Sequence, residues 1–204
     1  MTWIQHASRE WRVKYSPNIK TPVKILLAIA YSWLLWDGML YPIYALFAET
    51  IGSDVLETTG AIAIYLFVSG VLHIVIGKIS SSKNIAKQVM LGGYLLAAAS
   101  TFGYLLVTDT TGLFMIQILM GISNAMSSCT WDGIFSRNIK QKDAVFMWSI
   151  VEGGYAITSA IAAVLGGVIV MMFSFQVLFI IMGLIMVGAS IAIYFVQEIA
   201  PETY

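Results

Sequence analysis

Residues 24–47 read KILLAIAYSWLLWDGMLYPIYALF, a mostly apolar stretch with one carboxylate, Asp37, inside it. A helix needs about 20 mainly apolar residues to cross the hydrocarbon core of a bilayer, so this stretch predicts a membrane-spanning helix. Five similar stretches follow, and a turn at Phe173–Gln176 is expected between the last two: 58–79, 88–108, 112–135, 144–171 and 173–196. The sequence therefore predicts an all-α membrane protein with six transmembrane helices.

The composition agrees with a lipid environment. Of the 204 residues, 59% are hydrophobic and 11% are charged, whereas soluble domains carry about 25% charged residues. So few charges cannot cover a surface that faces water. The long apolar runs also argue against a transmembrane β-barrel, whose strands alternate over about 10 residues. The single cysteine, Cys129, excludes an internal disulfide and a cysteine-based zinc site.

The basic residues lie in alternate connections between the predicted spans. All eleven Lys and Arg residues precede or open the first span, or lie between spans 2 and 3 or between spans 4 and 5: Arg9, Arg12, Lys14, Lys20, Lys24, Lys78, Lys83, Lys87, Arg137, Lys140 and Lys142. The connections after the first and third spans carry acidic residues instead: Glu49, Asp54, Glu57 and Asp109. Because basic loops stay in the cytoplasm, we expect both chain termini there.

Three segments follow from this topology. We expect a cytoplasmic or interfacial N-terminal segment at 1–23, a six-helix transmembrane domain at 24–197 and a cytoplasmic tail at 198–204. The first segment is polar and basic, and the apolar run after it is too long for a cleavable signal peptide. The expected location is a bacterial-type cytoplasmic (inner) membrane, which the chain would cross several times.

Spans 1–3 and 4–6 are expected to form two inverted three-helix repeats, because three spans reverse the direction of the chain. Repeats of this kind are common in transporters. The tripeptide Trp36-Asp37-Gly38 recurs as Trp131-Asp132-Gly133. The first copy lies in the middle of its span and the second near a span end, which favours coincidence over a trace of the repeat.

The connection between spans 2 and 3 runs Gly77-Lys-Ile-Ser-Ser-Ser-Lys-Asn-Ile-Ala-Lys-Gln-Val-Met-Leu-Gly92. It resembles the signature of the major facilitator superfamily, roughly Gly-x-Leu-Ala-Asp-Arg-x-Gly-Arg-Arg-x followed by an apolar run with Gly. The segment Gln117-Ile-Leu-Met-Gly121-Ile-Ser-Asn-Ala resembles the family's Arg-x-Leu-x-Gly-x-Gly. The small residues of the fifth span resemble a third family pattern. The resemblance covers nearly the whole chain but one six-helix half of the usual twelve helices.

The chain departs from the family pattern at its charges. The family's Asp-Arg pair is Ser81-Ser82 here, and the arginine of its fourth helix is Gln117. The resemblance implies a gating loop at Gly77, Ser81, Ser82 and Lys83. Without the charged pair, that loop would lack the latch that normally holds the two halves together on the cytoplasmic side.

Carboxylates inside a membrane are costly and usually functional. Asp37 lies about 13 residues into the first span, roughly 20 Å along it, and Glu152 lies about two turns into the fifth span. A carboxyl group in low dielectric can exchange a proton near neutral pH or face a cation. A structural hydrogen bond to a neighbouring helix is the alternative for both. Asp132, near a span end and close to Arg137 in sequence, is expected to be structural.

Polar and aromatic residues share helix faces with these carboxylates, at steps of three and four. The candidate residues for substrate binding or proton coupling are Asp37, Glu152, Trp33, Tyr41, Tyr44, Gln117, Asn124, Trp148 and Tyr155. In the family, helices 1, 2, 4 and 5 line the cavity and helices 3 and 6 lie outside. The polar residues here fit that distribution, except for three on the third span: Ser100, Thr101 and Tyr104.

Two further patterns concern the shape of the helices. Pro42 predicts a kink in the first span, which membrane helices tolerate. The small residues Ala156, Ala160, Ala163 and Gly167 form a ridge on the fifth span. Such ridges are typical of close helix packing.

The sequence shows no metal-ligand cluster, no phosphate-binding glycine loop and no catalytic-triad spacing. We therefore expect no enzyme activity, no cofactor, no metal site and no nucleic-acid partner. The resemblance implies a half-size secondary transporter that works as a parallel homodimer by alternating access. Its substrate would be a neutral or cationic small molecule, with a proton as a candidate coupling ion. The alternatives are a non-transporting scaffold or assembly protein, a half that pairs with a different six-helix partner, and a fragment of a longer transporter.

Overall fold

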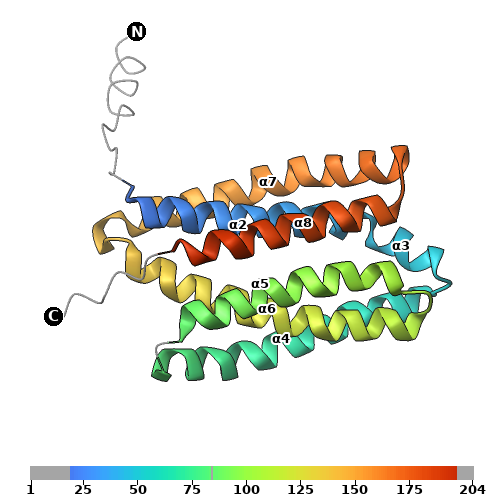
Figure 1. Cartoon of the computed structure of the whole chain (residues 1–204), viewed down its shortest axis with the longest axis horizontal. Coiled ribbons are helices and arrows are strands. Elements are labelled where there is room, and N and C mark those ends of the chain that lie inside the picture. Colours follow the sequence, from blue (N-terminus) through green and yellow to red (C-terminus); the bar gives the residue numbers. More distant parts are fainter. Residues whose placement is uncertain (1–18, 84, 197–204) are drawn as a thin grey trace, which may run out of the picture.

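The computed structural model describes residues 19–83 and 85–196, without the side chains of Ser82 and Lys83. These residues form a helical bundle and contain no strand (Figure 1). Six helical units are long and apolar enough to cross a membrane. The helices are α2 (Thr21–Leu40), α3 (Tyr44–Thr50), α4 (Val55–Lys83), α5 (Ala86–Gly103), α6 (Thr110–Asn138), α7 (Ala144–Met172) and α8 (Phe175–Tyr194). Short 3₁₀ turns join α2 to α3 (Tyr41–Ile43), extend α5 (Tyr104–Leu106) and precede α7 (Gln141–Asp143).

The six predicted spans are confirmed, and most of the helical units extend beyond the apolar stretches that predicted them. The kink predicted at Pro42 is found as the 3₁₀ turn Tyr41–Ile43, which interrupts the first unit. Between α7 and α8, the Ser174 side chain accepts a hydrogen bond from the Val177 N–H and caps α8. The first helix begins at Thr21, inside the expected N-terminal segment; residues 1–18 and 197–204 lie outside the described residues.

The helices pack as two groups of three. In one group α2 contacts α7 and α8, and in the other α6 contacts α4 and α5. Contact between α5 and α8 joins the groups, and Figure 1 shows them as an upper and a lower layer. Each group therefore combines helices from both halves of the sequence. The two Trp-Asp-Gly tripeptides have different partners: Trp36 Nε1 donates to Thr101 Oγ1 on α5, and Trp131 Nε1 donates to the Leu26 carbonyl on α2.

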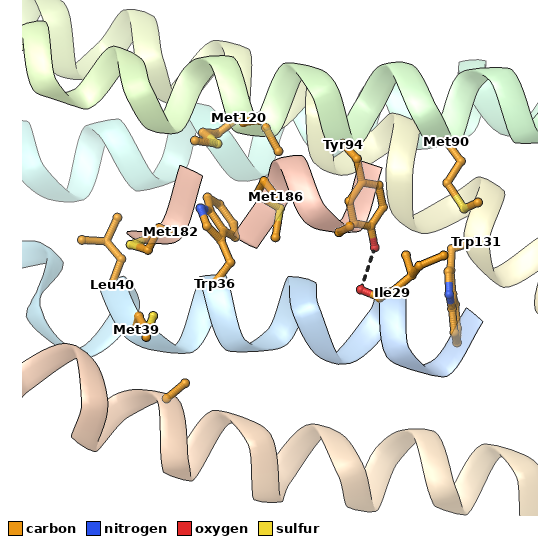
Figure 2. Close-up of a cluster of buried hydrophobic side chains, with 14 of the residues drawn as sticks. Ile29, Trp36, Met39, Leu40, Met90, Tyr94, Met120, Trp131, Met182 and Met186 are labelled. Atoms are coloured by element: carbon orange, nitrogen blue, oxygen red, sulfur yellow. Dashed lines mark hydrogen bonds between the residues drawn. The ribbon is translucent and has the colours of Figure 1, made fainter. Parts of the chain in front are cut away.

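Aromatic and methionine side chains fill the space between the groups. Figure 2 shows Trp36 of α2, Tyr94 and Met90 of α5, and Met182 and Met186 of α8 in this core. The Tyr94 hydroxyl donates a hydrogen bond of 3.3 Å to the Ile29 carbonyl, the dashed line in Figure 2. The third span is thus part of the core, which explains why it carries polar residues such as Thr101.

Glycines allow the closest approaches between helices. A Cβ placed on Gly38 of α2 would lie 2.8 Å from the Ala162 Cβ of α7, and one on Gly166 would collide with the Met39 carbonyl. On the other side of the bundle, a Cβ on Gly121 of α6 would lie 2.8 Å from the Tyr65 carbonyl of α4. Because small residues let helix backbones approach, these contacts fix the α2–α7 and α4–α6 pairs.

The ridge predicted on the fifth span does not pack within the chain. Ala156 and Ala160 are exposed, and a Cβ on Gly167 would meet nothing within 4 Å. The side of α7 that packs against α2 carries Ala162 and Gly166 instead. Close packing of the ridge therefore stays a prediction, because the glycine that packs against α2 is the first of the Gly166-Gly167 pair.

Charged residues gather at the two ends of the bundle. The described basic residues lie at the end where α2 begins and α8 ends, on the left in Figure 1: Lys20, Lys24, Lys78, Lys87, Arg137, Lys140 and Lys142. Lys87 Nζ donates to the carbonyls of Tyr194 and Val196, at 3.0 and 2.6 Å. A cation there complements the negative end of the α8 dipole, so one basic residue also ties α5 to α8.

We predict that Gly166→Ala destabilises the fold and that its neighbour Gly167→Ala does not. The first substitution forces a methyl group against the Met39 backbone, and overpacking of this kind costs about 1–3 kcal/mol. The second adds a methyl group in open space. Thermal unfolding of both purified variants in the same detergent measures the difference. Equal melting temperatures for the two variants would show that the α2–α7 approach is looser than described.

Candidate functional site

A cavity of about 340 Å³ lies between α2, α4 and α6, and we call it the Asp37 cavity. Its polar and aromatic walls include Trp36, Asp37, Tyr41, Tyr44, Tyr65 and Gln117. Of the described residues that line it, Asp37 is the one that is charged at neutral pH. An apolar cavity with a few convergent polar groups is the usual form of a small-molecule site.

Two tyrosines on either side of Pro42 line this cavity. Tyr41 is 74% exposed, whereas Tyr44, three residues later, is buried and 6% exposed. The buried Tyr44 hydroxyl interacts with the Gln117 side chain but makes no hydrogen bond of good geometry within the described part of the chain. Buried polar groups normally have well-formed hydrogen bonds, so a polar group that enters the cavity would compete with Gln117 for this hydroxyl.

A second cavity, of about 260 Å³, lies between α2, α6 and α7, and we call it the Glu152 cavity. Its walls include Trp33, Tyr94, Trp131, Asp132, Glu152 and Tyr155. The Asp132 and Glu152 side chains are exposed in the single chain. Asp132 lies within electrostatic reach of Glu152 on α7 and of His73 on α4. Asp132 of α6 and Glu152 of α7 therefore both line this cavity, and His73 of α4 lies near it.

Hydrogen bonds and ring contacts hold the walls of the Glu152 cavity in place. Trp131 is fixed by its bond to the Leu26 carbonyl at 2.9 Å and stacks on Phe135 at 4.7 Å. Trp33 meets the edge of Tyr94 at 5.2 Å. These rings are fixed before any ligand enters, so little conformational entropy would be lost on binding.

A row of polar contacts joins α4 to α6 beside the two cavities. Asn124 Nδ2 donates to Ser69 Oγ at 2.8 Å. One turn further, Ser128 Oγ and His73 Nε2 are hydrogen-bonded at 3.0 Å. The row satisfies these side chains in the membrane, where an unpaired polar group is expensive. It also places His73 next to a residue that lines the Glu152 cavity, Ser128.

A third, smaller cavity of about 140 Å³ lies between α2 and α7, at the level of the Asp37 cavity. It shares Asp37 and Tyr41 with the first cavity and Tyr155 with the second. The three cavities therefore adjoin one another around α2.

The predicted site residues divide between the two main cavities. Asp37, Tyr41, Tyr44 and Gln117 line the first, and Trp33, Glu152 and Tyr155 line the second. The structure thus does not bring Asp37 and Glu152 into one main cavity. The last two candidates line none of the three cavities: Asn124 is bonded to Ser69, and Trp148 packs on Phe135 with ring centres 5.2 Å apart.

The residues predicted as a gating loop belong to a helix. Gly77 and Ser81 lie in the last turns of α4, which continues to Lys83. The loop is shorter than expected because the serines continue the helix rather than end it. Ser81 is exposed, and a Cβ on Gly77 would meet nothing within 4 Å. The side chains of Ser82 and Lys83 lie outside the described residues, and the gating role remains a prediction.

Sequence reasoning did not select four aromatic residues that line the cavities: Tyr65, Tyr94, Tyr104 and Trp131. A signal for one of them was present, because Tyr104 was among the three polar residues that did not fit an outer third helix. Its ring is buried and lines the Asp37 cavity. In the described part of the chain, no group of three or more His, Cys, Asp or Glu residues is placed to hold a metal ion.

We predict that Asp37 and Glu152 act independently and that Asp132 and Glu152 are coupled. Unfolding free energies in mixed detergent–SDS micelles would be measured for Asp37→Asn, Asp132→Asn, Glu152→Gln and the double variants. Separate sites usually add within about 0.5 kcal/mol, whereas interacting charges deviate by about 0.5–3 kcal/mol. A larger deviation for the Asp37–Glu152 pair than for the Asp132–Glu152 pair would contradict the two-cavity description.

Comparison with known families gives one match. The family model described as Major Facilitator Superfamily matches residues 25–203. The match takes in nearly all of the six-helix bundle and both main cavities. No curated protein matches the chain.

Proposed function

Because the chain belongs to the Major Facilitator Superfamily, we propose that it is one six-helix half of a secondary transporter and that a second half completes the substrate path. Members of this superfamily are transporters rather than enzymes. The observation that carries the proposal is the position of the cavities. They adjoin one another around α2, and their carboxylates lie on a side of the bundle that no other part of the described chain covers.

The uncovered side has the wrong chemistry for lipid. Asp132 and Glu152 are exposed on it, and Tyr155 is 48% exposed. Ionisable residues within spans almost always face protein or a water-filled cavity. A second half that covers this side would remove them from lipid and enclose the three cavities.

The edge of α7 beside this side is built for a neighbouring helix. Gly153, Ala156, Ala160, Ala163 and Gly167 follow one another at steps of three and four, and a Cβ on either of these glycines would meet nothing within 4 Å. The side of α7 beyond this ridge carries large exposed residues that suit lipid: Ile157, Ile161, Val164 and Val168. The ridge thus supports close packing with a helix of another molecule.

A similar edge runs along α4, the helix on the opposite border of the uncovered side. Ala63 is exposed there, and a Cβ on Gly70 or Gly77 would meet nothing within 4 Å. Phe67 and Ile74 alternate with these small residues at steps of three and four, so they share the same face, and they are 72% and 78% exposed. The face of α4 beside the polar side therefore mixes small and large apolar residues, whereas α7 separates them.

We take the second half to be a second copy of the chain in the same orientation. The basic end of each bundle would face the cytoplasm of a bacterial-type inner membrane, so two copies must be parallel. A two-fold axis that runs along the membrane normal between the two polar sides brings α4 of one copy opposite α7 of its partner. The small-residue edges of these two helices would then meet.

The packing of the helices supports an inverted repeat within each copy. In such a repeat, α2, α4 and α5 of spans 1–3 correspond in order to α6, α7 and α8 of spans 4–6. The contact of α2 with α7 then corresponds to the contact of α6 with α4. The contact of α5 with α6 becomes that of α8 with α2, and the contact of α5 with α8 becomes itself. Transporters built from such repeats work by alternating access around a central site, and we assign that mechanism here.

The substrate follows from the Asp37 cavity. Its walls contain one carboxylate, the Tyr44 hydroxyl and several aromatic rings. An anion would be repelled, because no basic side chain lines this cavity in the described part of the chain. The substrate is thus a neutral or cationic, partly apolar small molecule, with Asp37 as its first polar contact or as the group that carries a coupling proton.

The first test is a disulfide crosslink in lipid vesicles, on a Cys129→Ser background. We expect Gly70→Cys on α4 and Ala156→Cys on α7, combined in one chain, to form a covalent dimer on mild oxidation. The two positions lie about 20 Å from the basic ends of their helices, at 1.5 Å per residue. The control combines Val71→Cys, about 100° around α4 from Gly70, with Ile161→Cys, about 100° around α7 from the ridge, and should stay monomeric.

Two other results would contradict the parallel homodimer. A control pair that crosslinks as readily as the test pair would contradict the assigned interface. A protein that stays monomeric with both pairs would point to a different six-helix partner or to a scaffold without transport. In that case, the same cysteines should be tested after co-purification from native membranes.

The second test concerns substrate charge. We expect organic cations or neutral amphiphiles, and not anions, to raise the melting temperature of the protein. Asp37→Asn should weaken the effect of a cation by at least about tenfold in concentration, which corresponds to about 1.4 kcal/mol. Glu49→Gln is the control, because Glu49 lines no described cavity. Stabilisation by an anion that Asp37→Asn leaves unchanged would refute the charge argument.

A further inference from the structure

The Glu152 cavity holds two carboxylates that the proposed substrate site does not use. We propose that this cavity is a second binding site, which takes a small organic ammonium ion between Asp132 and Glu152. The site is built by one chain, and it requires neither a second copy nor transport. It therefore goes beyond the proposed function and can be tested separately from it.

The charges around the cavity favour a cation. Asp132 of α6 and Glu152 of α7 lie within electrostatic reach of each other, and two like charges at one site repel. Arg137, which the sequence placed near Asp132, donates its Nε–H to the Gly133 carbonyl at 3.0 Å. Among the described residues that line the cavity, none is Lys or Arg, and α2 contributes no charged group to it.

His73 is the remaining titratable group near the carboxylates. It belongs to α4, interacts electrostatically with Asp132 and is hydrogen-bonded to Ser128 at 3.0 Å. It does not itself line the cavity. Because His73 lies outside the cavity lining, the space beside the two carboxylates stays open to a ligand.

The walls match an ammonium group that carries an apolar body. Trp33, Trp131 and Tyr155 line the cavity from three helices. The face of an aromatic ring attracts a cation, and tryptophan does so most strongly. Trp131 is 6% exposed and stacks on Phe135, so the more exposed rings of Trp33 and Tyr155 are the surfaces that a cation would meet. Carboxylates and aromatic rings together distinguish an organic ammonium ion from a metal ion, which would prefer several oxygen ligands.

The size of the cavity limits the ligand. At about 260 Å³ the cavity is smaller than most drug-binding pockets, so the ligand is a small amine.

Calorimetric titration of the full chain with Asp37→Asn in lipid nanodiscs tests the proposal, because this substitution removes the carboxylate of the proposed substrate site. The probe is benzyltrimethylammonium chloride, whose charge does not depend on pH, and benzyl alcohol and phenylacetate are the neutral and anionic comparisons. We expect the cation to bind at least about tenfold more tightly than the other two. Asp132→Asn and Glu152→Gln should each weaken binding by at least about tenfold, and Glu152→Asp should retain most of it.

The Asp37→Asn background separates this site from the proposed substrate site. On it we expect the distant control Glu49→Gln to change the affinity for the probe less than threefold. Melting temperatures of all variants confirm that they are folded. Absence of binding on this background, equal binding of benzyl alcohol, or insensitivity to both Asp132→Asn and Glu152→Gln would overturn the second site. The crosslinks and the Asp37 stabilisation test would stand unchanged, because neither involves Asp132 or Glu152.

Discussion

A carboxylate within the hydrocarbon core must be hydrated, paired or covered by protein, and this constraint organises the whole molecule. Asp37 is half-buried in a cavity between three helices, whereas Asp132 and Glu152 are exposed on one side of the bundle. Large apolar residues are exposed on the far side of α7, where Ile157 and Val164 are both more than half exposed. The protein thus has one side suited to lipid and one side suited to protein or water.

Close helix packing makes the polar side possible. The glycines at the α2–α7 and α4–α6 crossings bring backbones into contact, so the polar faces of α2 and α6 form a floor between α4 and α7. Hydrogen bonds from Trp36 to Thr101 and from Trp131 to Leu26 then fix the rings that shape the cavities. These bonds use the indole N–H groups inside the core and leave the carboxylates for a ligand or a proton.

The sequence was sufficient to predict the helices but not which side of each helix faces a cavity. The length of each apolar run predicts a span because the thickness of the bilayer fixes the length of the helix. Which residues of a span face a cavity depends on contacts between helices, and one position along a helix turns a side chain by about 100°. Tyr41 and Tyr44 were predicted on one face and both line the Asp37 cavity, but their exposed fractions, 74% and 6%, differ across the turn at Pro42 in a way that the sequence does not predict. For the same reason Gly166 packs and Gly167 does not, and Asp37 and Glu152 line different cavities.

The central claim is that protein, rather than lipid, covers the polar side in the membrane. Spin labels attached one at a time along α7, from Ser149 to Val168, on a Cys129→Ser background in bilayers, test it through collision rates with oxygen, which concentrates in lipid. We predict high collision rates with oxygen on the lipid side of α7, at Ile157, Ile161, Val164 and Val168. We predict low rates along the ridge, at Gly153, Ala156, Ala160 and Ala163. Oxygen collision rates on the ridge as high as those at Ile157 and Ile161 would show that lipid covers this edge and would contradict the claim.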